Sequence, residues 1–164
     1  MKPLEIFPVK ITKDLVLISF GGIPKDYAKI YGLLDFFQMR EISISFLAEG
    51  SSGKGEKLLT IAINKKDYAK LSAEMEELRS VFGGQNIAIM KDVVLIRILG
   101  AHFDIQPGIA NLLFRALNEA KVPVLANSTT ITSSLIIVSQ EQMESALRAV
   151  ASVFHVPKQK GSIL

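Results

Sequence analysis

The sequence predicts an α+β fold built from two copies of one small unit, with antiparallel sheets that carry helices on one face. The first observation is an internal repeat, because residues 14–18 read Asp-Leu-Val-Leu-Ile and residues 92–96 read Asp-Val-Val-Leu-Ile. The second is the order of hydrophobic periods, which is the same after each of these segments. Two half-size units favour a two-module binding protein over an enzyme.

The first unit begins with a continuous apolar run at residues 15–20, as expected for a buried central strand. Pro24 should lie in the first turn of the helix that follows. Alternating residues then predict strands at 42–46 and 59–63, joined by a turn at residues 49–56. A second helix completes the unit. Its apolar stripe consists of Leu71, Met75, Leu78 and Phe82.

The second unit follows the same order. Residues 93–99 predict a strand, and residues 100–108 predict a loop. Apolar positions over residues 109–120 then line one face of a helix. Two further strands are expected at residues 122–126 and 135–138, joined through a turn that is rich in Ser and Thr.

The last helix should open with a capping box, because Gln142 follows Ser139 at the required spacing. With residues 87–90 as a closing strand, each unit follows the ferredoxin-like order βαββαβ. The open sheet face suits a dimer or inter-unit interface, and residues 1–13 should add an edge strand or a partner contact. The apolar stripe of the last helix repeats the spacing of the first, at Met143, Leu147, Val150 and Phe154.

These elements predict a first unit over residues 1–90, a second over residues 91–156, and a loose tail over residues 157–164. The chain has 164 residues, of which 49% are hydrophobic and 21% charged, which argues against global disorder. The net charge of +3 is scattered, so we expect no nucleic-acid partner. Without a signal-like segment or a long apolar run, we expect a cytoplasmic protein that does not enter a membrane.

Catalytic, metal and cofactor sites are not predicted. The chain has no cysteine, which excludes disulfides, thiolate metal sites and cysteine nucleophiles. Residues 50–55 resemble a phosphate loop, but their glycine spacing differs from a Walker A motif and favours a hairpin turn. His102 and His155 lie far apart in the chain without a paired acidic cluster, so they make a poor metal site.

Residues 99–110, which read Leu-Gly-Ala-His-Phe-Asp-Ile-Gln-Pro-Gly-Ile-Ala, resemble the second ACT domain in the regulatory half of aspartate kinases. Residues 113–120 and 122–129 extend this resemblance. The similarity is good over residues 92–154 and weaker over residues 14–89. A chain of this length leaves no room for the kinase catalytic half as well.

The resemblance implies a stand-alone ACT protein that senses a free amino acid at an inter-unit or dimer interface. Lysine, threonine or another aspartate-family amino acid is the implied ligand. A homodimer and a separate metabolic enzyme are the implied partners. The first unit departs from the family pattern, because Glu49 and Gly50 stand where aspartate kinases usually have Gln-Asn. The family's loop-to-helix junction and its polar strand end correspond to Gln106, Pro107, Gly108, Ile109, Asn127, Ser128 and Thr129.

The junction also has a physical logic of its own. The first N–H groups of a helix have no internal partners, and the helix dipole makes that end partly positive. Gly108 would let a carboxylate approach these groups, and Pro107 would fix the entry angle. The helix end contributes about 0.3–2 kcal/mol, whereas a micromolar ligand needs about 8 kcal/mol. A second protein surface, from the neighbouring unit or subunit, must therefore bury the ligand. Its ammonium or side chain would meet Asp104, Asn127, Ser128 or Thr129.

Three alternatives stay open on the sequence alone. Pro107 and Gly108 could form a helix start without any ligand. The chain could be a ligand-free dimeric interaction or scaffold protein derived from an aspartate kinase regulatory domain. A small enzyme on a ferredoxin-like frame has only the fold in its favour, and a fold does not determine function.

Overall fold

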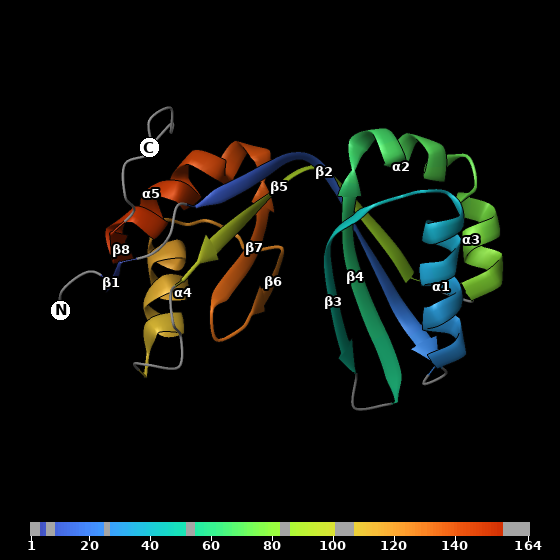
Figure 1. Ribbon diagram of the computed structural model, residues 1–164, viewed down its shortest axis with the longest axis horizontal. Coiled ribbons are helices and arrows are strands. Elements are labelled where there is room, and N and C mark those ends of the chain that lie inside the picture. The colour runs from blue at the N-terminus through green and yellow to red at the C-terminus, as the bar shows by residue number, and fades with distance from the viewer. Residues whose placement is uncertain are drawn as a thin grey trace. The chain divides into compact units, whose positions relative to one another are not determined.

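The computed structural model describes residues 4–5, 9–24, 27–51, 55–82, 86–100 and 107–155. The chain divides into two compact units (Figure 1). The first-repeat unit is Asp14–Asp92, and the second-repeat unit is Met1–Lys13 together with Val93–Leu164. Strands β2 (Lys10–Pro24) and β5 (Asn86–Leu99) are long, and each contributes residues to both units.

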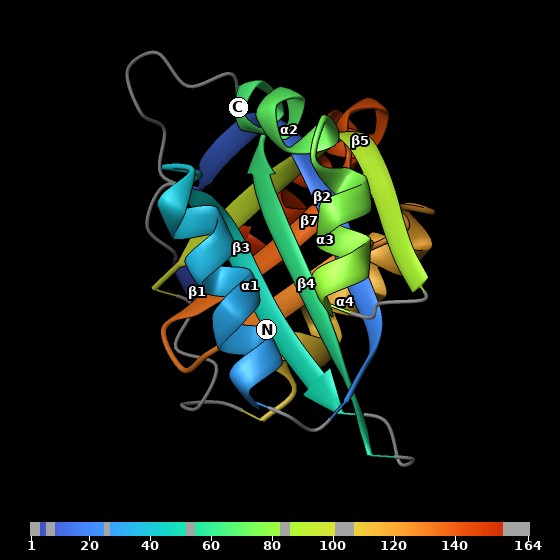
Figure 2. The same ribbon diagram turned by 90° about the vertical axis from the view of Figure 1, so that its right-hand side faces the viewer.

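The first-repeat unit is a four-stranded sheet with three helices on one face (Figure 2). The strand order is β3-β4-β2-β5, and β4 pairs antiparallel with both of its neighbours. The further elements are β3 (Ile44–Ser51), β4 (Glu56–Asn64), α1 (Tyr27–Met39), α2 (Lys65–Ser72) and α3 (Met75–Phe82).

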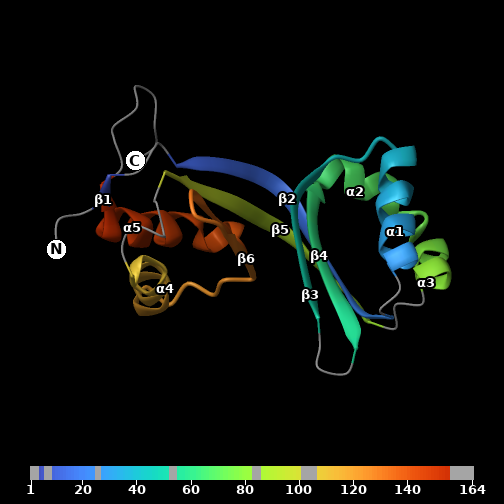
Figure 3. The same ribbon diagram turned by 60° about the horizontal axis from the view of Figure 1, so that its bottom comes forward.

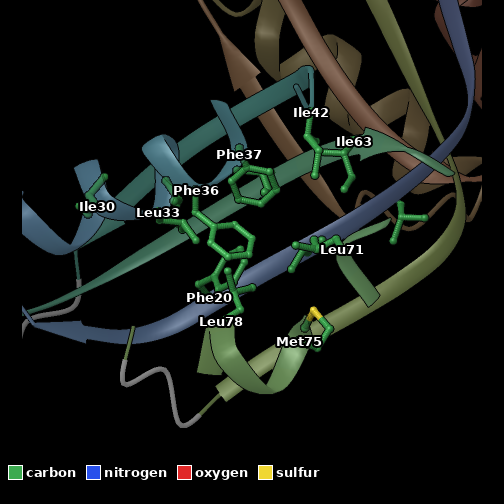
Figure 4. Close-up of a cluster of buried hydrophobic side chains, with 14 of the residues drawn as sticks. Phe20, Ile30, Leu33, Phe36, Phe37, Ile42, Ile63, Leu71, Met75 and Leu78 are labelled. Carbon is green, nitrogen blue, oxygen red and sulfur yellow. The ribbon is translucent and has the colours of Figure 1, made fainter. Parts of the chain in front are cut away.

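The core of the first-repeat unit lies between this sheet and its helices. The register pairs Val16 with Ile63 and Ile18 with Ile61, so these side chains share one face of the sheet. That face and the helices bury one apolar cluster. Figure 4 shows residues from both layers of the cluster, among them Phe20, Leu33, Phe37, Leu71 and Leu78.

The second-repeat unit repeats this arrangement with the strand order β2-β5-β7-β6. Its helices α4 and α5 lie side by side (Figure 3). Its apolar cluster joins Val94, Ile96 and Ile98 of β5 to residues of both helices. Strands β1 and β8 pair with each other in parallel and form a separate two-stranded sheet. The elements are β1 (Leu4–Glu5), α4 (Ile109–Glu119), β6 (Ala126–Thr129), β7 (Ser133–Ser139), a 3₁₀ turn (Gln140–Gln142), α5 (Met143–Val153) and β8 (Phe154–His155).

The backbone confirms the internal repeat. Asp14 and Asp92 both have left-handed backbones, with φ of 56° and 54°. Gly22 and Gly100 also correspond, with φ of 71° and 73°. Non-glycine residues rarely adopt positive φ, although Asp tolerates it better than most. The two segments therefore share conformation as well as sequence, and the predicted α+β, ferredoxin-like fold class is confirmed.

The first unit differs from expectation in two places. Pro24 is the last residue of β2 and does not start a helix, because β2 continues beyond Phe20 through a register shift. The expected second helix is two helices, α2 and α3, separated at residues 73–74. Three residues of its predicted apolar stripe, Leu71, Met75 and Leu78, are buried on the two sides of the break, and the side chain of Phe82 lies outside the described residues.

The second unit also corrects two predictions. Residues 122–125 are not a strand, because the Val122 N–H closes the end of α4 on the Leu117 carbonyl and Pro123 has no N–H to donate. The capping box is wrong as well. Ser139 precedes the 3₁₀ turn and makes no side-chain cap, whereas Gln142 is the residue that precedes α5.

The start of the chain belongs to the second-repeat unit, whereas the sequence predicts a first unit over residues 1–90. Val9 and Ile11 contact the apolar cluster of the second-repeat unit, although the sequence placed residues 1–13 in the first. The expected strand at residues 87–90 is continuous with the strand at 93–99, since both belong to β5. The tail at residues 157–164 lies outside the described residues. None of the helices in the described part is long and apolar enough to cross a membrane.

Candidate functional site

The predicted site begins where α4 begins. Asp104 and Gln106 lie outside the described residues. Pro107 and Gly108 are exposed, whereas Ile109, the first residue of α4, is fully buried in the core. The buried Ile109 side chain fixes the start of α4 against the unit, while the backbone just before it faces solvent.

Gly108 is the residue that precedes α4, and its backbone is left-handed with φ of 94°. Glycine adopts this conformation without the steric cost that a Cβ atom brings. The Gly108 carbonyl accepts a hydrogen bond from the Leu112 N–H at 2.9 Å, but glycine supplies no side-chain cap to the first turn. Among the described residues other than its two chain neighbours, no heavy atom lies within 4 Å of the position that a Cβ would take. The first turn of Ile109–Glu119 also contains no acidic side chain. This helix end can therefore accept an anion.

The three polar residues of β6 do not share one face. The register pairs Asn127 with Ile136 and Thr129 with Ser134, so both residues point to the side that the helices cover. Ser128 pairs with Leu135 and points to the opposite side. Asn127 and Thr129 are exposed, and Ser128 is half-buried. The structure thus brings two of the three residues to the helix-covered face.

A cluster of hydroxyl groups forms the end of the β6–β7 hairpin. The Thr129 Oγ1 lies 3.0 Å from the Oγ of Ser134, and the Thr130 Oγ1 lies 2.9 Å from the Oγ of Ser133. Ser134 is fully buried. Sequence reasoning missed Ser134, although it alternates with the core residues Ile136 and Val138 and so occupies a core-facing position of the strand.

The hydroxyl cluster and the start of α4 lie at the same end of the second-repeat unit (Figure 1). The last residue of β5, Leu99, pairs with Ser133 at the start of β7. The Gly100 N–H then donates to the Thr132 carbonyl at 2.8 Å. The chain that leaves β5 toward α4 is therefore tied to the hairpin turn. This end offers helix amides for a carboxylate and oxygen atoms for an ammonium group.

The corresponding end of the first-repeat unit carries charges instead. Lys57 forms an ion pair with Glu49, and its ammonium nitrogen lies 5.1 Å from the centre of the Tyr27 ring. The hydrogen bond to Glu49 raises the pKa of Lys57, and burial opposes this shift. Tyr27 is the first residue of α1, as Ile109 is of α4.

Other features do not suggest a second site. Among the residues that the structure describes, no three His, Cys, Asp or Glu side chains are grouped to hold a metal ion. A shallow hollow of about 320 Å³ lies beside Asn118, Lys121, Val122 and Pro123. It sits at the far end of α4 from Gly108.

Comparison with known proteins agrees with this fold. Residues 88–152 match an ACT domain. The aspartokinase of Thermus thermophilus is 24% identical over 152 residues, which are 92% of this chain and 37% of that protein. The aspartate kinase of Pseudomonas putida is 17% identical over 146 residues, 89% of this chain and 36% of that protein. The chain thus spans little more than a third of the length of these curated relatives.

Solved structures show the same fold. The ligand-free regulatory subunit of aspartate kinase from Thermus thermophilus superposes with a TM-score of 0.78 at 20% identity, covering 94% of this chain and 100% of that one. The aspartate kinase of Synechocystis gives a TM-score of 0.84 at 16% identity, covering 100% of this chain and 29% of that one. The resemblance to the regulatory half of aspartate kinases is confirmed, and the ACT match lies on the half that contains Gly108.

Proposed function

We propose that this chain is an amino-acid-binding regulatory protein, and that a free amino acid binds at the start of α4 in its ACT domain. The observation that carries the proposal is the exposed helix end at Gly108, which lies at the same end of the unit as the hydroxyl cluster of the β6–β7 hairpin. The ligand carboxylate would accept hydrogen bonds from the first N–H groups of α4.

The ammonium group and side chain of the ligand need oxygen partners. Asn127 and Thr129 are exposed on the helix-covered face and can supply them. We retain Asp104 and Gln106 as further partners from the sequence. Ser128, which the sequence also assigned to the ligand, points to the opposite face and is not part of the proposed contact. Lysine, threonine or another aspartate-family amino acid is the proposed ligand class, because the relatives are aspartate kinases.

A second copy of the chain completes the proposed site. The helix end supplies only about 0.3–2 kcal/mol, and a micromolar ligand needs about 8 kcal/mol. Burial by a partner surface provides the difference, so we propose a homodimer. One solved relative is described as aspartokinase alpha and beta subunits. By analogy, we propose that the chain performs no catalysis and regulates a separate enzyme of amino-acid metabolism.

Thermal melting in the presence of each proteinogenic amino acid tests the proposal. A ligand that binds only the folded state stabilises it by RT ln(1 + [L]/Kd), which is about 2.7 kcal/mol at a hundredfold excess over Kd. One or a few amino acids should therefore raise the melting temperature, with lysine and threonine tested first. If the folded protein shows no shift with any amino acid, the ligand-free scaffold becomes the better account.

Gly108→Asp and Gly108→Asn form a matched pair for locating the site. Both side chains tolerate a left-handed backbone and have nearly the same shape. Only the Asp variant places a negative charge where the ligand carboxylate should bind. The melting shift should be lost in Gly108→Asp and largely kept in Gly108→Asn. Equal shifts in the two variants would place the ligand elsewhere.

A further inference from the structure

The strand registers identify which residues correspond in the two units. In the second-repeat unit, Thr129 pairs with Ser134, which in turn pairs with Ile98 of β5. In the first-repeat unit, Glu49 pairs with Leu59, which in turn pairs with Phe20 of β2. Phe20 and Ile98 correspond, because each lies two residues before a left-handed glycine, Gly22 or Gly100. The three strands therefore place Glu49 at the position of Thr129, and Leu59 at that of Ser134.

Lys57 joins Glu49 on the same face. Its register partner on β3 is Ser51, two residues from Glu49, so both charged side chains point toward the helix-covered side. The Lys57 ammonium contacts the Glu49 carboxylate and lies over the ring of Tyr27 at the start of α1. The chain thus holds one ammonium and one carboxylate at the end that corresponds to the proposed ligand position.

The Lys57 side chain is more covered than the other paired lysines of the same unit, although the pair lies at the surface and the Glu49 side chain is 33% exposed. The Lys57 side chain is 12% exposed, whereas Lys65 and Lys70 are 55% and 58% exposed although each also pairs with an aspartate. The Lys57 ammonium is therefore held against Glu49 and Tyr27 at the place where a ligand would have to put its own charged groups.

An α-amino acid would bring the same two charged groups to this end. We infer that the pair of Lys57 and Glu49, packed on Tyr27, closes the first-repeat position to ligand, so that each chain takes one amino acid rather than two. The ligand then binds at the second-repeat unit, where neutral Thr129 and Ser134 replace Glu49 and Leu59. The count of one ligand rests on the proposed function, whereas closure by the pair does not.

Lysine labelling tests the closure without any ligand. The folded protein is treated with an amine-acylating reagent, and the rate at each lysine is followed by mass spectrometry. Lys57 should react several-fold more slowly than the exposed Lys66. Glu49→Gln should accelerate labelling at Lys57 and leave Lys66 and Lys70 unchanged. The closure is overturned if Lys57 reacts as fast as Lys66 in the unmodified protein, or if Glu49→Gln has no effect on its rate.

Titration calorimetry with l-lysine and with l-threonine tests the count. Binding of one equivalent per chain is expected, and two equivalents would overturn the inference. If neither amino acid binds while Lys57 remains protected, the proposed function fails for these ligands and the closure is retained. Fast labelling at Lys57 together with one bound equivalent would instead retain the proposed function and remove the explanation by this ion pair.

Discussion

Glu41 and Lys121 adopt the same left-handed backbone, with φ of 53° and 54°, just beyond the ends of α1 and α4. The Glu41 N–H donates to the Gln38 carbonyl at 3.0 Å, and the Lys121 N–H donates to the Asn118 carbonyl at 2.9 Å. The next residue in each unit, Ile42 or Val122, donates to the carbonyl five positions back and is buried in the core. Both helices therefore end in a Schellman motif with its hydrophobic contact.

Glycine should improve both helix ends. A residue with a Cβ atom pays roughly 1–2 kcal/mol for the left-handed backbone, and glycine does not. We expect Glu41→Gly and Lys121→Gly each to raise the free energy of unfolding by up to about 1 kcal/mol. The gain is smaller than the strain relieved, because glycine also gains entropy in the unfolded chain, which lowers stability. Urea unfolding measures the change.

Asp35→Gly is the matched control, since Asp35 is exposed in the middle of α1. Glycine is the less favourable of the two residues in a helix interior, so this variant should lower stability by a few tenths of a kcal/mol. If glycine destabilises at positions 41 and 121 as it does at 35, the left-handed conformation is not what limits these helix ends.

The contact between Arg40 and Glu74 should make the stability of the first-repeat unit depend on pH. Its Nε donates to the Glu74 carboxylate at 2.7 Å, and its guanidinium stacks on the Phe36 ring at 3.4 Å from the centre. The hydrogen bond from Arg40 lowers the pKa of Glu74 below its ordinary 4.5, against an opposing effect of burial. A lowered carboxyl pKa stabilises the fold above the unfolded-state pKa, and this stabilisation is lost as pH falls through the folded-state pKa.

Glu74→Gln should therefore be less stable than the unmodified protein at pH 7, and the gap should close as the pH falls below about 4.5. Urea midpoints measured from neutral to acid pH follow the gap. In an Arg40→Met background, Glu74→Gln should cost less, because the partner that lowers the pKa is gone. A gap that widens in acid would contradict this account of the pair.

Thr129 and Ser134 should be energetically coupled. The buried Ser134 hydroxyl bonds to Thr129, so Thr129→Val leaves it without that partner at a cost of about 1–3 kcal/mol. Adding Ser134→Ala should recover part of the loss, with a coupling of about 0.5–3 kcal/mol in a double-mutant cycle. Additive effects would show that the contact contributes nothing specific. Thr130→Val is the matched control and should cost less, because Thr130 is exposed and its hydroxyl contacts the half-buried Ser133.

The sequence predicted the elements that depend on local patterns. Most of the apolar run at residues 15–20, most of its repeat at 93–99, and Leu71 and Leu78 are buried in the core, because hydrophobic patterning predicts which side chains leave water. The junction at Gly108 could also be predicted, since Pro-Gly marks a turn and glycine is accepted at the position before a helix.

Features that depend on pairing between strands were not visible. Local sequence does not reveal that Thr129 lies opposite Ser134, or that Glu49 and Lys57 meet across β3 and β4. The register decides both, and a shift by one residue would reverse the faces of all these side chains. Ser128 was grouped with Asn127 and Thr129 for a different reason, because the sequence ended this strand at residue 126, whereas β6 continues to Thr129 and alternation along it separates Ser128 from its two neighbours.

Asn64 and Ser139 differ in whether their side chains cap the helical segment that follows, and this difference should affect stability. Both residues end a strand and precede a helical segment, but only the Asn64 side chain caps, accepting from the Lys66 N–H at 2.8 Å. Ser139 makes no side-chain cap to the turn that follows it. Asn64→Ala should therefore destabilise the protein by about 1 kcal/mol, whereas Ser139→Ala should change stability by less than about 0.5 kcal/mol. Asn64→Asp should retain most of the stability, because a carboxylate accepts the same bond and favours a helix start. Urea unfolding of the three variants measures these differences, and equal losses for the two alanine variants would show that the Asn64 cap is not what separates them.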